Sequence, residues 1–480
     1  MIRKKRIFGL FRVSELLLVG LLISLLFALF ALTNSFSTLH NMLATAGLIQ
    51  RSANQKPHYQ VGQEVQVKLP GKYRDWIGKV SKRLANLDDK YRLNHHYEIT
   101  FPTEQVSIHV GESDLTKADK AKFAKGDIVK LSSPKVKEDG NTYQGQLATV
   151  EKVKTHHAPS SGGYQYDMTL NDGQHLDGIP EKAIVVPYRI ALKEENTAQE
   201  NNQLLRKAFT YAQTHPNSIL AFPKGQFRIG SITPDVDYAV LPSETAIVGN
   251  QTELIIQGTM YWFGFPTGPE AHQGVHHLTL AGIHFKASDL NKGNHFMIMA
   301  DHGSDWHVYN NRFTMVHQRN SHLFDLGSLQ NSLFEKNDFI GYAPELTEES
   351  GLLSKAGGHD FFSEAIQFDA ATHRFSWDGD LLKKIAPNYD AFNQIRHLCH
   401  NITISQNQFL PYIDSKGKLK AYSGSIGQHS SEVGAITVIN NVFASSIVSR
   451  ANKEPSPSWF MEPIHFPPNS PVTIVGNTIN

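Results

Sequence analysis

Four short segments in the C-terminal half of the chain alternate apolar residues with acidic, amide or imidazole ones. They are residues 321–326, 364–369, 425–429 and 463–466. In a β-strand this alternation turns apolar residues such as Phe324 and Phe368 inward and their neighbours outward. Aligned on the apolar residues, the segments predict one outward column, formed by Asp325, Asp369, His429 and His465.

This column has the residue types of an acid–base site. Neighbouring strands lie about 4.8 Å apart, so stacked carboxylates repel each other unless they share a proton or a cation. A general acid with a general base, or a carboxylate nucleophile, is the chemistry that cleaves glycosidic bonds. We therefore expect Asp325 and Asp369 to be catalytic, and His429 to be a proton shuttle or charge stabiliser. The alternative is a solvated face of ion-paired aspartates and histidines.

Further residues are expected to bind the substrate. Two insertions, at about 342–362 and 371–398, flank the segment 364–369, and long loops beside a rigid strand often build binding sites. Trp377 and Arg396 in the second insertion suit stacking on a sugar ring and pairing with a uronate carboxylate. The remaining candidates to position sugar hydroxyls are His322, Glu364, Gln367 and His465. No metal site is expected, and Ca²⁺ enters only if the reaction is a lyase elimination.

The same half of the chain contains a repeated apolar pattern with an asparagine. Its copies end at Phe285, Phe313, Phe339, Phe409, Phe443 and Ile479, so the steps are 28, 26, 70, 34 and 36 residues. Self-similarity near this period is typical of a solenoid, and the longest step holds both insertions. The asparagines at 311, 337, 407, 441 and 477 are expected to point inward and bond one another, a structural role.

An amphipathic segment at 201–212 precedes this repeat, followed by a strand, a Pro-Lys-Gly turn and a second strand at 219–229. With the repeat, this opening resembles the pectate-lyase-like superfamily, in which a helix caps the first coil of a right-handed parallel β-helix. The resemblance covers about residues 197–480 and implies an all-β fold. Segments 364–369 and 426–430 are similar to those of β-helix surface proteins of lactic-acid-type bacteria. Lyases, hydrolases, epimerases and adhesins share the scaffold, so the resemblance leaves the reaction open.

Residues 58–190 read as two weakly similar β-rich segments, each with a glycine-led turn and alternating strands. They look like a duplicated small β-barrel of the bacterial Src-homology type. Such modules either bind wall polymers or act as a spacer, and the sequence leaves both open.

The N-terminus is basic at residues 3–6 and 12 and then uncharged over residues 16–32. We expect residues 1–33 to be a cytoplasmic tail and a single membrane-spanning anchor, 34–57 a tether, and 191–480 the β-helix, outside the cell. A cleaved signal peptide is the alternative.

The composition is that of an ordinary globular protein. Of 480 residues, 40% are hydrophobic and 19% charged, and the net charge of +1 gives no reason to expect nucleic-acid binding. The single cysteine excludes an internal disulfide. The sequence thus predicts an extracytoplasmic glycoside hydrolase or polysaccharide lyase. The alternatives are a non-catalytic surface protein that binds or organises exopolysaccharide, and a uronan epimerase.

Overall fold

The computed structural model describes residues 57–84, 95–102, 105–132, 143–155, 164–232, 237–265, 274–317, 322–342, 364–371, 398–428, 432–446 and 462–480. No helix within these ranges is long and apolar enough to cross a membrane. The predicted anchor at 16–32 lies outside them, as do His429, Trp377, Arg396 and most of both insertions.

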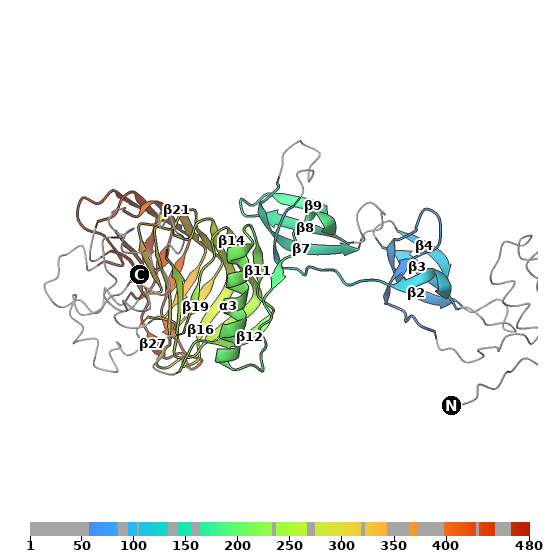
Figure 1. Cartoon of the computed structure of the whole chain (residues 1–480), viewed down its shortest axis with the longest axis horizontal. Helices are drawn as coiled ribbons and strands as arrows, with labels where there is room; N and C mark the ends of the chain where they lie inside the picture. The colour runs from blue at the N-terminus through green and yellow to red at the C-terminus, as the bar shows by residue number, and fades with distance from the viewer. Residues whose placement is uncertain are drawn as a thin grey trace, which may run out of the picture. The chain divides into compact units, whose positions relative to one another are not determined.

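Two small sheets precede the repeat region (Figure 1). The first is antiparallel, in the order β4-β3-β2-β1-β5: Val106–Gly111, His96–Phe101, Ile77–Leu84, Glu64–Val67 and Leu115–Lys117. Its core includes Val65, Tyr97 and Phe101, which have no exposed surface. The second has the order β6-β7-β8-β9: Ile128–Lys130, Leu147–Thr155, Tyr164–Leu170 and His175–Pro180. These sheets confirm the prediction of small β modules before the repeat.

From residue 188 onward the strands pair in parallel between successive coils, as expected of a parallel β-helix. The pairing forms three ladders. Ladder A contains β10 (Tyr188–Arg189), β11 (Ile219–Ala221), β14 (Thr245–Ile256), β16 (Leu278–Ala287), β18 (His307–Tyr309), β21 (Gln330–Glu335), β24 (His400–Ser405), β29 (Ile436–Ile439) and β32 (Val472–Val475). Ladder B contains β12 (Gly225–Ile229), the second halves of β14 and β16, β19 (Arg312–Thr314), β22 (Asp338–Ile340), β25 (Gln408–Leu410), β30 (Val442–Phe443) and β33 (Thr478–Ile479).

Ladder C is a separate seven-stranded sheet. Its strands are β13 (Asp237–Val240), β15 (Thr259–Gly264), β17 (His295–Asp301), β20 (Phe324–Gly327), β23 (Glu364–Asp369), β28 (Ser425–Gly427) and β31 (Ile464–His465). A short hairpin of β26 (Tyr412–Ile413) and β27 (Leu419–Ala421) stands apart from the ladders. Each of the four candidate segments therefore overlaps a strand of ladder C: β20, β23, β28 and β31.

The predicted asparagine ladder is confirmed at the turn between ladders A and B. Asn337 has no exposed surface, and both its backbone N–H and its side-chain amide donate to Asn407 Oδ1 at 2.9 Å. Equivalent bonds continue in both directions to Asn311, Asn441 and Asn477. Each coil is thus tied to the next by buried hydrogen bonds that satisfy the turn.

A stack of phenylalanine rings fills the interior beside this turn. Phe285, Phe313, Phe339, Phe409 and Phe443 lie on successive coils, with ring centroids 4.5 to 5.2 Å apart and nearly parallel planes. These are the residues that end the repeat copies, so the predicted coil steps are correct.

The first coil is covered by α3 (Ala198–Thr214), which lies against β11 and β12 in Figure 1 and contacts both. Thr197 and Glu200 form a capping box at its start, and Phe209 packs edge-on to Trp262 at 5.2 Å. The predicted cap helix is therefore confirmed.

Candidate functional site

The outward column of ladder C differs from the predicted one by two residues. Asp325 pairs with Gln367, not with Asp369, and Gln367 continues through Gly427 to His465. The sequence alignment matched Phe324 to Phe368, whereas the structure pairs Phe324 with Ile366. A slip of two residues preserves the inward and outward faces, so alternation alone could not detect it. The predicted column of Asp325, Asp369, His429 and His465 is therefore wrong.

Asp369 belongs to a second column, two residues further along the strands. It pairs with Gly327, and Gly327 pairs with Asp301 on the preceding coil. A Cβ built on Gly327 would lie 2.1 Å from Asp301 Oδ1, so the carboxylate of Asp301 occupies the space that a side chain at 327 would need. Asp301 and Asp369 thus lie on the same face, separated by a glycine that leaves room between them.

Asp325 lies diagonally between these two aspartates, on the middle of the three coils. Strands about 4.8 Å apart and a rise of about 3.3 Å per residue put its Cα about 8 Å from the Cα of Asp301 and of Asp369. Three consecutive coils therefore carry three aspartates on the outer side of ladder C, which we call the carboxylate face. Asp325 and Asp369 are half-buried, whereas Asp301 is buried, with 6% of its surface exposed. Asp325 and Asp369 were predicted to be catalytic, whereas Asp301 was not among the predicted site residues.

Two glutamines fix the carboxylate of Asp369. Gln367 Nε2 donates to Asp369 Oδ2 at 2.6 Å, and Gln428 Nε2 donates to Oδ1 at 3.3 Å. Both glutamines are buried, with 3% and 0% of their surface exposed, while Asp369 itself is half-buried. Each carboxylate oxygen thus has an amide donor, which holds the group in one orientation. Gln367 was expected to bind sugar; the structure makes it a support for Asp369.

Glu364 and His465 meet below the surface. His465 Nε2 lies 2.6 Å from Glu364 Oε1, and neither side chain has any exposed surface. His465 Nδ1 donates to Glu462 O at 2.8 Å, so the contact with Glu364 holds a second proton, carried by either the imidazole or the carboxyl group. Both residues were predicted to position sugar hydroxyls. Because both side chains are buried, their contact links β31 to β23, and no sugar reaches them in this conformation. We call this pair of residues the clasp.

The clasp passes over β28, which lies between the two strands. A Cβ at Gly427 would fall 2.5 Å from His465 Cδ2 and 2.7 Å from its Nε2. Glycine at this position therefore lets the imidazole cross one coil to reach Glu364. On the other side, His322 Nδ1 donates to Glu364 O at 3.1 Å and lies 3.6 Å from Glu364 Oε2. His322 is also buried, so it too supports β23 rather than the outer face.

Two further histidines surround His322. Burial lowers the pKa of His295 to about 4, and the positive charge of His322 adds to the shift. The pKa of His317 lies well below its ordinary value for the same reasons. Nε2 of each is buried and has no hydrogen-bond partner among the residues that the structure places. Both imidazoles are therefore neutral at pH 7.

His295 makes the stability of the chain depend on pH. Its pKa is about 4 when folded and near 6.5 when unfolded, so the unfolded chain binds more protons between these values. The free energy of unfolding should therefore fall by about 3 kcal/mol from this residue as the pH drops from 7 to 4. Urea unfolding at both pH values should show a smaller fall in His295→Gln. The exposed control His277→Gln should match the parent chain; an equal fall in His295→Gln would contradict the assignment.

The outer face of ladder C is apolar on its first coils. Phe263, Phe265, Met297 and Met299 form a cluster outside the solenoid interior, with 1 to 6% of their surface exposed. Tyr238 and Tyr261 pack against it. The face changes from apolar on β13, β15 and β17 to polar on β20, β23 and β28, and the carboxylates lie at this change.

Asp301 and Gln428 were not predicted to belong to the site, although the sequence contains a signal for Asp301. Alternation through residues 295–301 turns Phe296, Ile298 and Ala300 inward, and so turns Asp301 outward. Gln428 follows β28 directly, but its bond to Asp369 depends on the register between two coils.

Among the described residues, no three acidic, cysteine or histidine side chains are grouped so as to hold a metal ion.

Comparison with known proteins gives similarity to solved structures only. No protein-family model matches the chain, and no curated protein matches it. The surface adhesin PfbA of Streptococcus pneumoniae is 16% identical over 61% of this chain and 62% of that chain, with a TM-score of 0.40. A second PfbA structure gives 15% identity over 54% and 61%, with a TM-score of 0.37.

An iota-carrageenase bound to iota-carrageenan fragments is 10% identical over 54% of this chain and 55% of that chain, with a TM-score of 0.22. This chain therefore covers less than two thirds of the adhesin and of the carrageenase. Similarity at this level does not identify a function.

Proposed function

We propose that this chain is an extracytoplasmic polysaccharide hydrolase whose reaction is carried by Asp301, Asp325 and Asp369. The observation that carries the proposal is their placement on one outward face of three consecutive coils, with Gly327 leaving room between two of them. Cα separations of about 8 Å are compatible with carboxyl groups that hold a water molecule between themselves and a sugar.

The hydrogen bonds of the three aspartates favour a different role for each carboxylate. Asp369 accepts from two amides, which suits a base that takes a proton from water. Asp325 then donates a proton to the oxygen of the leaving sugar, while Asp301 orients the water from the other side of Gly327.

Hydrolysis fits this face better than elimination. A lyase or an epimerase abstracts the proton next to a uronate carboxylate and needs a cation to neutralise that carboxylate. None of the seven described strands of ladder C contains a lysine or an arginine. The proposed substrate is therefore a polysaccharide whose scissile unit needs no cationic partner on these strands.

The proposal also includes the handedness of the β-helix, the membrane anchor, the small sheets and three candidate site residues. The β-helix winds right-handed, as connections between parallel strands almost always do. Residues 16–32 anchor the chain in the cell membrane, and 191–480 lie outside as the catalytic domain. The small sheets of residues 58–190 act as a spacer. Trp377 and Arg396 bind the polysaccharide, and His429 shuttles a proton or stabilises charge.

A screen of bacterial polysaccharides tests the proposal. The full chain should release new reducing ends from at least one neutral or uronate-containing polymer, without the ultraviolet absorbance of unsaturated sugars. Reducing ends together with that absorbance would identify a lyase. Binding without any product across the panel would identify a surface protein that holds polysaccharide.

A further inference from the structure

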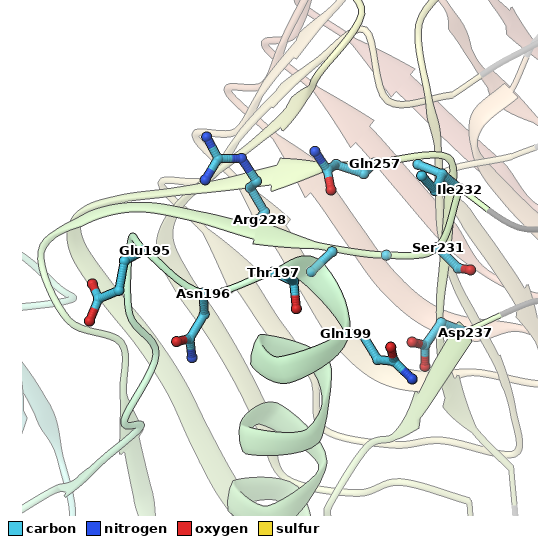
Figure 2. A pocket seen from close by; sticks show the side chains of 11 residues that line it. Glu195, Asn196, Thr197, Gln199, Arg228, Ser231, Ile232, Asp237 and Gln257 are labelled. Carbon is cyan, nitrogen blue, oxygen red and sulfur yellow. The ribbon is translucent and has the colours of Figure 1, made fainter.

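A concavity lies at the opposite end of the solenoid from the last coil, beside the start of α3 (Figure 2). It has a volume of about 760 Å³, within the range of small-ligand sites. Figure 2 shows Glu195 and Asn196 toward one end, Gln199 and Asp237 toward the other, and Arg228 and Gln257 along the strand wall. None of these residues belongs to the carboxylate face of ladder C.

The wall of this cavity is fixed by buried contacts. Asn202 has no exposed surface; its Nδ2 donates to Gly230 O at 3.0 Å, and its Oδ1 accepts from Gly230 N at 2.9 Å. Gly258 has a φ of +66°, and a Cβ there would lie 1.8 Å from Ser231 O. These contacts hold the backbone of the strand wall against the neighbouring coil, so the cavity exists before any ligand binds.

The cavity presents polar groups that the protein leaves unused. The side-chain amides of Gln199 and Gln257 make no hydrogen bond to any described residue. The backbone N–H groups of Ala198 and Gln199 likewise have no acceptor there, because the capping box uses the N–H of Glu200. One N–H group of Arg228 donates to Glu194 O at 3.1 Å, and its other N–H groups are available to a ligand.

The charges around the cavity select the kind of ligand. Asp237 is paired with Arg206, and its carboxylate also accepts from Asn202. Glu195 is exposed at the rim, and Arg228 lies on the strand wall. With Asp237 neutralised by Arg206, the charges that remain on the lining are one negative, Glu195, and one positive, Arg228. The cavity therefore has no net charge that selects an ion, whereas its mixed donors and acceptors match hydroxyl groups, which both donate and accept.

We propose that this cavity is a second carbohydrate site, which binds a neutral saccharide unit through the amides of Gln199 and Gln257. The choice of a saccharide rests on the proposed function; the cavity itself does not take part in hydrolysis. Its place at the capped end, on strands before the carboxylate face, would let the solenoid hold a polymer at a point away from the cleavage site.

The test uses the full chain carrying Asp325→Asn and Asp369→Asn, so that bound sugar is not cleaved. Calorimetric titration with maltohexaose, cellohexaose, laminarihexaose and chitohexaose should detect binding of at least one. Adding Gln199→Ala and Gln257→Ala should weaken that binding about tenfold, since each lost hydrogen bond costs about half to one and a half kcal/mol. Gln257→Trp, which fills the cavity, should abolish the binding that depends on this site.

Gln226→Ala is the matched control, because Gln226 is an exposed glutamine on the same strand as Arg228 but outside the cavity. It should leave the affinity unchanged. Three results would overturn the inference: no neutral hexasaccharide binds; the cavity variants bind as well as the parent; or an oligogalacturonate binds more tightly than every neutral sugar. Because binding is read in an inactive chain, failure of the hydrolase proposal does not decide this outcome.

Discussion

Replacing Asp369 with asparagine should lower polysaccharide cleavage roughly 10²–10⁴-fold, the usual cost of losing a general base. Asparagine keeps the volume of the side chain and still offers an oxygen to Gln367 or Gln428. It cannot take a proton from water at neutral pH. Initial rates of reducing-end release by the variant and the parent chain measure the effect, and binding of the polymer should survive.

Asp338→Asn provides the control for this experiment. Asp338 is a half-buried aspartate on ladder B, where it lies 3.6 Å from Arg312. It has the same chemistry and lies on the same solenoid but not on the carboxylate face, so cleavage should stay at the parent rate. Equal losses of cleavage rate in both variants would mean that the substitutions lower activity by disturbing the fold. An unchanged rate in Asp369→Asn would exclude it as the base.

Replacing Glu364 with alanine should destabilise the chain by about 3–5 kcal/mol, as expected when one partner of a fully buried, hydrogen-bonded acid–imidazole pair is removed. The variant removes the contact of His465 Nε2 with Glu364 in a site that has no exposed surface. Glu364→Gln, which keeps the volume and a hydrogen-bonding oxygen, should lose less. Urea unfolding of the three chains at pH 7 gives these differences directly.

Glu335→Ala is the comparison for that measurement. Glu335 also pairs with a histidine, His307, at 2.9 Å, but 16% of its side chain is exposed on ladder A. Its loss should cost clearly less than that of Glu364, because water can replace the partner. If both variants lose the same stability, Glu364 and His465 are not the clasp that holds β31 to β23.

The repeat was predictable because its residues interact with copies of themselves. Phe313 stacks on Phe339, and Asn337 bonds Asn407, so each position requires the same residue type on the next coil. Such identity appears in the sequence as a period. The cap helix was predictable for a related reason: its apolar face follows the helical repeat, and its capping box is local.

The site was less predictable because it depends on register. Asp325 and Asp369 were recognised by residue type, but the pairing of Asp325 with Gln367 depends on which of two inward residues meets Phe324. The burial of Glu364 and His465 depends on Gly427, a residue with no side chain of its own to suggest a role. A contact across two coils leaves no local pattern, so sequence reasoning took both residues for sugar ligands.

Hydrolysis in oxygen-18-labelled water tests the central claim most directly. If the carboxylates of ladder C activate water, mass spectrometry should find one heavy oxygen at each new reducing end. The label should disappear together with the product in the Asp325→Asn and Asp369→Asn chains. Fragments that are unlabelled and lighter by one water would show elimination, and labelled fragments from both variants at the parent rate would show that these aspartates do not perform the reaction.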